Sequence, residues 1–145
     1  MTDRNYYEYF KRKLKEALPF EDIAVDKICT RNKVTLIERQ NETNFKTMKY
    51  DFRTSDKRTY EVKTDSRASK TGNVFVEFEQ FGKNSGIEIT ESMYHIYVID
   101  NTYYLILTID LIELCEGCNI GFVKISNSKG YLVDFETFKY PAYEI

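Results

Sequence analysis

The fold is decided by residues 50–63, which read Tyr50-Asp51-Phe52-Arg53-Thr54-Ser55-Asp56-Lys57-Arg58-Thr59-Tyr60-Glu61-Val62-Lys63. This pattern predicts two β-strands joined by a polar turn. Side chains alternate along a strand, so Glu61 and Lys63 share one face. A hairpin centred on Asp56 places Asp51 directly opposite Glu61, where Cβ atoms lie roughly 4.5–5.5 Å apart. The stretch therefore predicts two facing carboxylates beside a lysine.

Two carboxylates at this spacing can hold one hard divalent cation through oxygen ligands at about 2.0–2.5 Å. Phosphodiester hydrolysis needs a nucleophilic water and relief of the charge that builds on the phosphate. A Mg²⁺ ion held by Asp51, Glu61 and the Val62 carbonyl would acidify a water and polarise the phosphate, while Lys63 orients the water or neutralises the phosphate. The alternative is a cross-strand salt bridge of Lys63 with its carboxylate neighbours, which leaves two opposed acids without a cation.

Length and composition favour one domain over residues 1–145, with 42% hydrophobic residues available for a core. No stretch approaches the roughly 20 apolar residues of a membrane helix, and the N-terminus lacks the apolar segment of a secretory signal. The three cysteines, Cys29, Cys115 and Cys118, form no disulfide framework. We therefore expect an intracellular protein without membrane partners.

The formal charge of −2 hides an asymmetry between the two parts of the chain. Residues 1–83 contain 18 Lys and Arg against 14 Asp and Glu, whereas residues 84–145 contain 3 against 9. The part that bears the candidate site is thus mildly basic. This charge is compatible with a polyanionic partner but is far from that of a strongly basic nucleic-acid binder.

Hydrophobic periodicity predicts a helix from Thr2 or Asp3 to about Leu18, ended by Pro19. Further strands are expected over 34–37, 74–78, 94–99, 103–108, 121–125 and 131–135, with a helix over 108–115 and a short helix possible within 20–32. Residues 100–102 indicate a second hairpin. This outline predicts a single α/β or α+β domain with a mixed sheet.

At Asp51, Glu61 and Lys63 the chain resembles the PD-(D/E)xK nuclease superfamily, and its later strands look like those of small phage or large-DNA-virus members. Tyr50 stands where proline is common. The resemblance implies an α/β, restriction-endonuclease-like core, a mixed β-sheet flanked by helices, and a Mg²⁺- or Mn²⁺-dependent deoxyribonuclease. It also implies one acid on the first helix, for which Glu8 is the candidate with Glu16 equally placed, and one on the next strand, for which Glu77 is the candidate.

Several basic residues are candidates for contact with DNA phosphates. Arg67, Lys70 and Lys83 lie in polar segments that flank the candidate site. Lys11 and Lys15 lie off the apolar stripe of the first helix, where a solvated helix face is the alternative.

The leading function is an endonuclease acting on DNA, either restriction-like or structure-specific and junction-resolving. A chain this short is expected to form a homodimer if it cuts both strands. The alternatives are a non-catalytic module that binds nucleic acid or protein on the same fold, and an unrelated α+β interaction domain. His95 is expected to be a core or edge residue, and Cys115 and Cys118 to be buried or incidental thiols.

Overall fold

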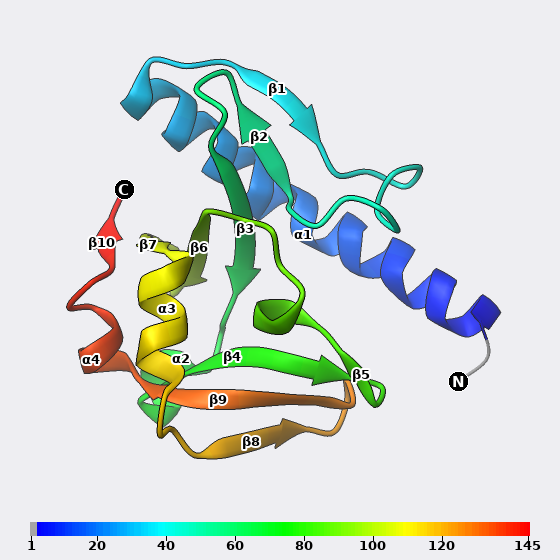
Figure 1. Cartoon of the computed structure of the whole chain (residues 1–145), viewed down its shortest axis with the longest axis vertical. Helices are drawn as coiled ribbons and strands as arrows, with labels where there is room; N and C mark the ends of the chain where they lie inside the picture. Colours follow the sequence, from blue (N-terminus) through cyan, green and yellow to red (C-terminus); the bar gives the residue numbers. More distant parts are fainter. Residues whose placement is uncertain (1–2) are drawn as a thin grey trace.

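The computed structural model describes residues 3–145 (Figure 1). The helices are α1 (Asp3–Asn32), α2 (Ala68–Thr71), α3 (Thr108–Cys115) and α4 (Phe135–Phe138), with a 3-10 turn η1 (Gly86–Glu88). The strands are β1 (Leu36–Arg39), β2 (Phe52–Thr54), β3 (Thr59–Thr64), β4 (Asn73–Gln80), β5 (Lys83–Asn84), β6 (Tyr94–Ile99), β7 (Thr102–Leu107), β8 (Ile120–Val123), β9 (Ser128–Asp134) and β10 (Tyr143–Glu144).

The strands form two sheets. The first has the order β1-β2-β3-β6-β7-β10, and it is mixed because β3 and β6 run parallel while its other neighbours are antiparallel. The second has the order β5-β4-β9-β8 and is antiparallel. The predicted mixed α/β class with a mixed sheet is confirmed. The finer restriction-endonuclease-like core stays a prediction. Strand β4 does not join the first sheet but lies in the second, because it pairs with β9, far along the chain.

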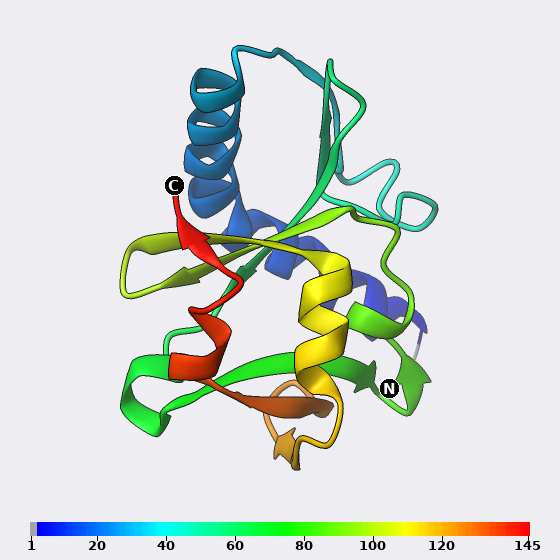
Figure 2. The same ribbon diagram turned by 60° about the vertical axis from the view of Figure 1, so that its left-hand side comes forward.

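Helix α1 does not end at Pro19, which corrects the prediction from the sequence. It runs without interruption from Asp3 to Asn32, and Figure 2 shows that it bends in its middle, as expected for a helix with an internal proline. Ala24 and Ile28, one turn apart beyond the proline, are completely buried. Their packing stabilises this half of the helix and outweighs the cost of the proline, about 3 kcal/mol. Within residues 3–145, no helix is long and apolar enough to cross a membrane.

Two hydrophobic clusters lie on opposite faces of the first sheet. The cluster beneath α1 includes Phe52 and Tyr60, whose rings stack with centroids 4.8 Å apart. The cluster on the other face joins strands β6 and β7 to α3, α4 and the second sheet. Because Tyr60 faces α1, the alternation of β3 directs Glu61 away from that cluster.

The second predicted hairpin, β6–β7, is confirmed. Ile99 pairs with Thr102, leaving Asp100 and Asn101 as the two turn residues. Both have positive φ angles, 49° and 63°, as a tight two-residue hairpin turn requires. This local signal pairs β6 with β7. The separate parallel pairing of β6 with β3 then supports the strand that bears the candidate site.

Candidate active site

Strand β3 holds Glu61 and Lys63 in the interior of the first sheet, between β2 and β6. The register pairs Phe52 with Tyr60 and Arg53 with Thr59, so the hairpin is centred on Asp56 as predicted. On the other side, Glu61 pairs with His95 of β6. The two functional candidates therefore lie on a strand that neighbours support on both edges.

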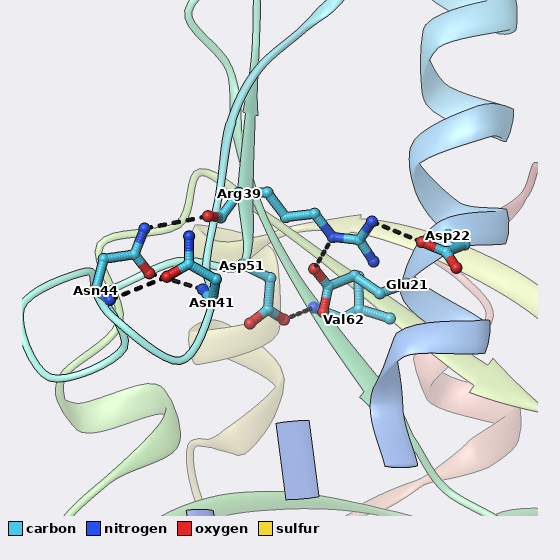
Figure 3. A network of polar contacts seen from close by, with 7 residues as sticks. All are labelled: Glu21, Asp22, Arg39, Asn41, Asn44, Asp51 and Val62. Carbon is cyan, nitrogen blue, oxygen red and sulfur yellow. Dashed lines mark hydrogen bonds and ion pairs between the residues drawn. The ribbon is translucent and has the colours of Figure 1, made fainter. Parts of the chain in front are cut away.

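Asp51 lies directly before β2. Its amide donates to the Tyr60 carbonyl over 2.8 Å, and its Oδ2 accepts a hydrogen bond from the Val62 amide over 2.7 Å (Figure 3). Burial raises the pKa of Asp51 well above its ordinary value, and the charges of Glu61 and Glu21 raise it further. Lys63 and the Val62 amide act in the opposite direction without reversing the shift. Asp51 thus lies among acids whose repulsion is only partly compensated.

Lys63 is the cation among these acids. Its Nζ lies 3.3 Å from Glu61 Oε1. Burial alone would lower the pKa of Lys63, but the charges of Glu61, Glu77 and Asp51 outweigh it and raise that pKa. Lys63 therefore stays protonated at neutral pH and can act as a positive donor, not as a base.

Glu77 on β4 is the acid that the resemblance implies on the next strand. Val74 and Val76 of the same strand are buried in the core, so Glu77 lies on the opposite face. Its carboxylate accepts a hydrogen bond from Ser85 Oγ over 2.9 Å. Glu77 lines the same cavity as Lys63, which brings an acid from the second sheet to a site built on the first.

Glu21 on α1 is an acid of the site that the sequence reasoning missed. It is only 4% exposed, and its Oε1 lies 2.7 Å from Arg39 Nε (Figure 3). Arg39 Nη1 lies 2.6 Å from Asp22. Burial raises the pKa of Glu21 against the lowering effect of Arg39, and Glu61 and Asp22 add to the rise. Because the sequence predicts that Pro19 ends the helix, Glu21 is not among the candidate acids of the first helix. A helix that continues through Pro19 includes Glu21 as such a candidate.

A cavity of about 680 Å³ connects these groups. Its polar lining includes Glu21, Asp51, Glu61, Lys63 and Glu77, and α1 contributes aromatic and basic side chains. Four carboxylates thus line the cavity together with Lys63, and one of them, Glu21, is paired with Arg39. Lys13, Lys46 and Lys49 also line the cavity, so its lining balances four acids with four lysines.

Other predicted site residues lie elsewhere. Glu8, Glu16 and Lys15 are exposed on α1, and neither they nor Lys11 line the cavity in the described part of the chain. Tyr7, Tyr9 and Phe10 of the first turns line the cavity, whereas Glu8 is exposed, and Glu21 is the α1 acid that lines it. Lys13 is the α1 lysine that lines the cavity.

Of the three basic residues beyond β3, one lies near the site. Arg67 lines a second cavity that adjoins Lys63 and Glu77. Lys70 is exposed in the last turn of α2, and Lys83 is exposed on β5. Neither lysine lines either cavity among residues 3–145.

His95 and the cysteines do not contribute chemistry here. His95 is 2% exposed, and its Nδ1 lies 2.8 Å from Thr108 Oγ1. Burial, with a smaller effect of the Lys63 charge, lowers the pKa of His95 to about 3, so the ring is neutral. Cys115 is buried, which raises its pKa to about 12, and Cys118 donates to the Leu114 carbonyl over 3.1 Å. The expected core histidine is confirmed.

No group of three His, Cys, Asp or Glu side chains among the described residues has a ready-made metal-binding arrangement. The sequence matches no protein-family model and no curated protein.

Proposed function

We propose that this protein is a Mg²⁺- or Mn²⁺-dependent endonuclease that hydrolyses DNA phosphodiester bonds. The observation that carries the proposal is the convergence of Asp51, Glu61 and Lys63 in one cavity. Two acids and a lysine on neighbouring segments are the groups that metal-assisted phosphodiester hydrolysis uses. Glu21 and Glu77 add carboxylates from two further elements.

The donor set fits a hard divalent cation. Burial is the main cause of the raised pKa values of Asp51 and Glu21, and the charge of Glu61 raises both further. Asp51, Glu61 and the Val62 carbonyl would hold the ion, because carboxylate and carbonyl oxygens are the ligands that Mg²⁺ prefers in proteins. When bound, the ion supplies positive charge to a phosphate oxygen and lowers the pKa of a water.

The protein's own residues then position the reactants. Lys63 remains a cation next to Glu61 and presents N–H donors to a phosphate oxygen or to the attacking water. The Val62 amide orients the Asp51 carboxylate through its hydrogen bond. Lys13, Lys46 and Lys49, which also line the cavity, offer positive charge to the DNA backbone.

A second candidate function is a non-catalytic module that binds nucleic acid or protein. The contact that favours it is the Lys63–Glu61 ion pair, which can serve as a structural cross-link without any metal. Cleavage separates the two candidates, because only the nuclease needs Lys63 and Asp51 for a chemical step.

The test is cleavage of linear, supercoiled, flapped and four-way-junction DNA with Mg²⁺ or Mn²⁺. The wild type is compared with Lys63→Ala and Asp51→Asn. Lys129→Ala is the matched control, because Lys129 forms a similar ion pair, 3.4 Å from Glu79, outside the cavity. Cleavage that only the two site variants lose supports the nuclease. Binding without cleavage, insensitive to metal, favours the module.

If both strands are cut, we expect a homodimer. One cavity can act on one strand at a time, and a two-fold symmetric dimer would offer two cavities, one for each strand. Sedimentation on a junction substrate measures this. Such a dimer suits a restriction-like or junction-resolving enzyme, whereas a monomer suits one that nicks.

A further inference from the structure

A second cavity, of about 500 Å³, lies beside the candidate active site. Lys63 and Glu77 line both cavities, so the two spaces adjoin at the residues proposed to act on the phosphate. The rest of its lining comes from the end of β3 and the segment after it, from Thr71 of α2 and Tyr97 of β6, and from strands β4, β8 and β9. The proposed catalytic chemistry requires none of that lining.

The second sheet supplies an aromatic and apolar wall. Phe75 and Leu132 lie opposite each other on β4 and β9 and face this cavity. The Phe75 ring packs directly on Gly130, where an added Cβ would lie 2.6 Å from it. Leu132 packs in the same way on Gly121, where a Cβ would lie 2.7 Å away. Because neither glycine has a side chain, the Phe75 and Leu132 side chains can lie flat against the sheet, which leaves the space of the second cavity above them open.

The opposite rim is polar and held in place. Asp65 Oδ2 accepts a hydrogen bond from the Phe75 amide over 2.9 Å, and Asp65 Oδ1 accepts one from the Arg67 amide over 3.1 Å. Asp65 therefore ties the segment after β3 to the wall strand. Arg67 and Lys63 place two positive charges on the lining, and Asn73 adds an amide.

From this arrangement we infer that the second cavity binds an unpaired nucleobase next to the phosphate held at Lys63. This inference rests on the proposed function and names its substrate class: DNA with an unpaired nucleotide at the cleavage point. The volume falls in the usual range for small-molecule sites, about 300–1,000 Å³. The Phe75 ring offers a stacking surface, and Arg67 offers charge to the adjoining phosphate. A base within an intact duplex cannot enter such a cavity without leaving the stack.

The experiment compares two duplexes that differ only in one extrahelical 2-aminopurine. Binding is measured in EDTA by fluorescence anisotropy, and stacking by 2-aminopurine emission, so that neither readout needs cleavage. We expect tighter binding of the bulged duplex and quenched emission. Phe75→Leu should reduce the preference about 5- to 150-fold, since base–aromatic stacking contributes about 1–3 kcal/mol.

Phe78→Leu is the matched control, because Phe78 lies on the same strand and packs on Tyr131, 4.7 Å between ring centroids, outside this cavity. Arg67→Ala, at an exposed position, gives a second test if Phe75→Leu fails to fold. Equal affinity for the two duplexes, or a preference that survives both variants, overturns the inference. If the protein prefers the bulged duplex and quenches its 2-aminopurine emission but cleaves no DNA, the proposed function is refuted and the inferred nucleobase site is still supported.

Discussion

The backbone amide of Val62 donates a hydrogen bond to Asp51 Oδ2 over 2.7 Å, and so ties the acid before β2 to the strand that bears Glu61 and Lys63. The bond orients the carboxylate, but it does not cancel the repulsion from Glu61 and Glu21. Metal-free protein therefore holds Asp51 against the charges of two neighbouring acids, and the first two predictions follow from that repulsion.

The first prediction concerns pH. Because the folded pKa of Asp51 is raised, the folded state binds a proton more tightly than the unfolded chain. The resulting stabilisation is present below the ordinary aspartate pKa of about 3.9 and is lost as the pH rises through the folded pKa. In EDTA, Asp51→Asn should flatten this decline, because asparagine does not ionise, while its amide oxygen can still accept the Val62 hydrogen bond. Urea unfolding across a pH series measures it, and parallel profiles for the two proteins would refute the prediction.

The second prediction concerns the cation. Mg²⁺ or Mn²⁺ should raise the melting temperature, because a ligand at 100 times its Kd stabilises the folded state by about 2.7 kcal/mol. Asp51→Asn and Glu61→Gln should lose most of the shift, and EDTA should reverse it. Lys129→Ala should keep it. Calorimetry measures the melting temperatures. If the cation raised the melting temperature equally in all variants, the ion would bind elsewhere.

The third prediction concerns Arg39. Arg39→Leu leaves the buried Glu21 carboxylate without its partner, and should cost about 1–3 kcal/mol of unfolding free energy. Adding Glu21→Leu should recover much of the loss, because two apolar side chains leave no unpaired charge. Arg53→Ala is the control, since the Arg53–Glu38 pair is more exposed and should contribute only about 0–1 kcal/mol. Urea denaturation distinguishes these values; equal losses for Arg39→Leu and Arg53→Ala would contradict the prediction.

The fourth prediction concerns Gly86, which approaches the backbone at Glu77. A Cβ at Gly86 would lie 2.2 Å from the Glu77 carbonyl oxygen, and the φ angle is +51°. Gly86→Ala should therefore destabilise the protein by about 1–3 kcal/mol and displace Glu77, with loss of cleavage. Gly72→Ala is the matched control, because its φ is +80° but no atom lies within 4 Å. It should show only the cost of positive φ, about 1–2 kcal/mol, and keep activity. Circular dichroism melts and cleavage assays test both; full activity in Gly86→Ala would refute the role given to this contact.

Local patterns predicted the elements whose partners are close in the chain. The β2–β3 register about Asp56 is as expected, because alternation and turn chemistry act over a few residues. The β6–β7 turn lies within the predicted residues 100–102 and is one residue shorter, because Thr102 already pairs with Ile99. These parts of the site needed no knowledge of distant packing.

The sequence by itself thus determined the hairpin that carries Asp51, Glu61 and Lys63, since its register depends on neighbouring residues. Tertiary structure alone decided which helical acid joins them. The burial of Ala24 and Ile28 continues α1 past Pro19 and brings Glu21, not Glu8, to the cavity. It also decided that β4 pairs with β9 in a second sheet, which creates the space beside Lys63. Such contacts join residues far apart in the chain, and no local pattern encodes them.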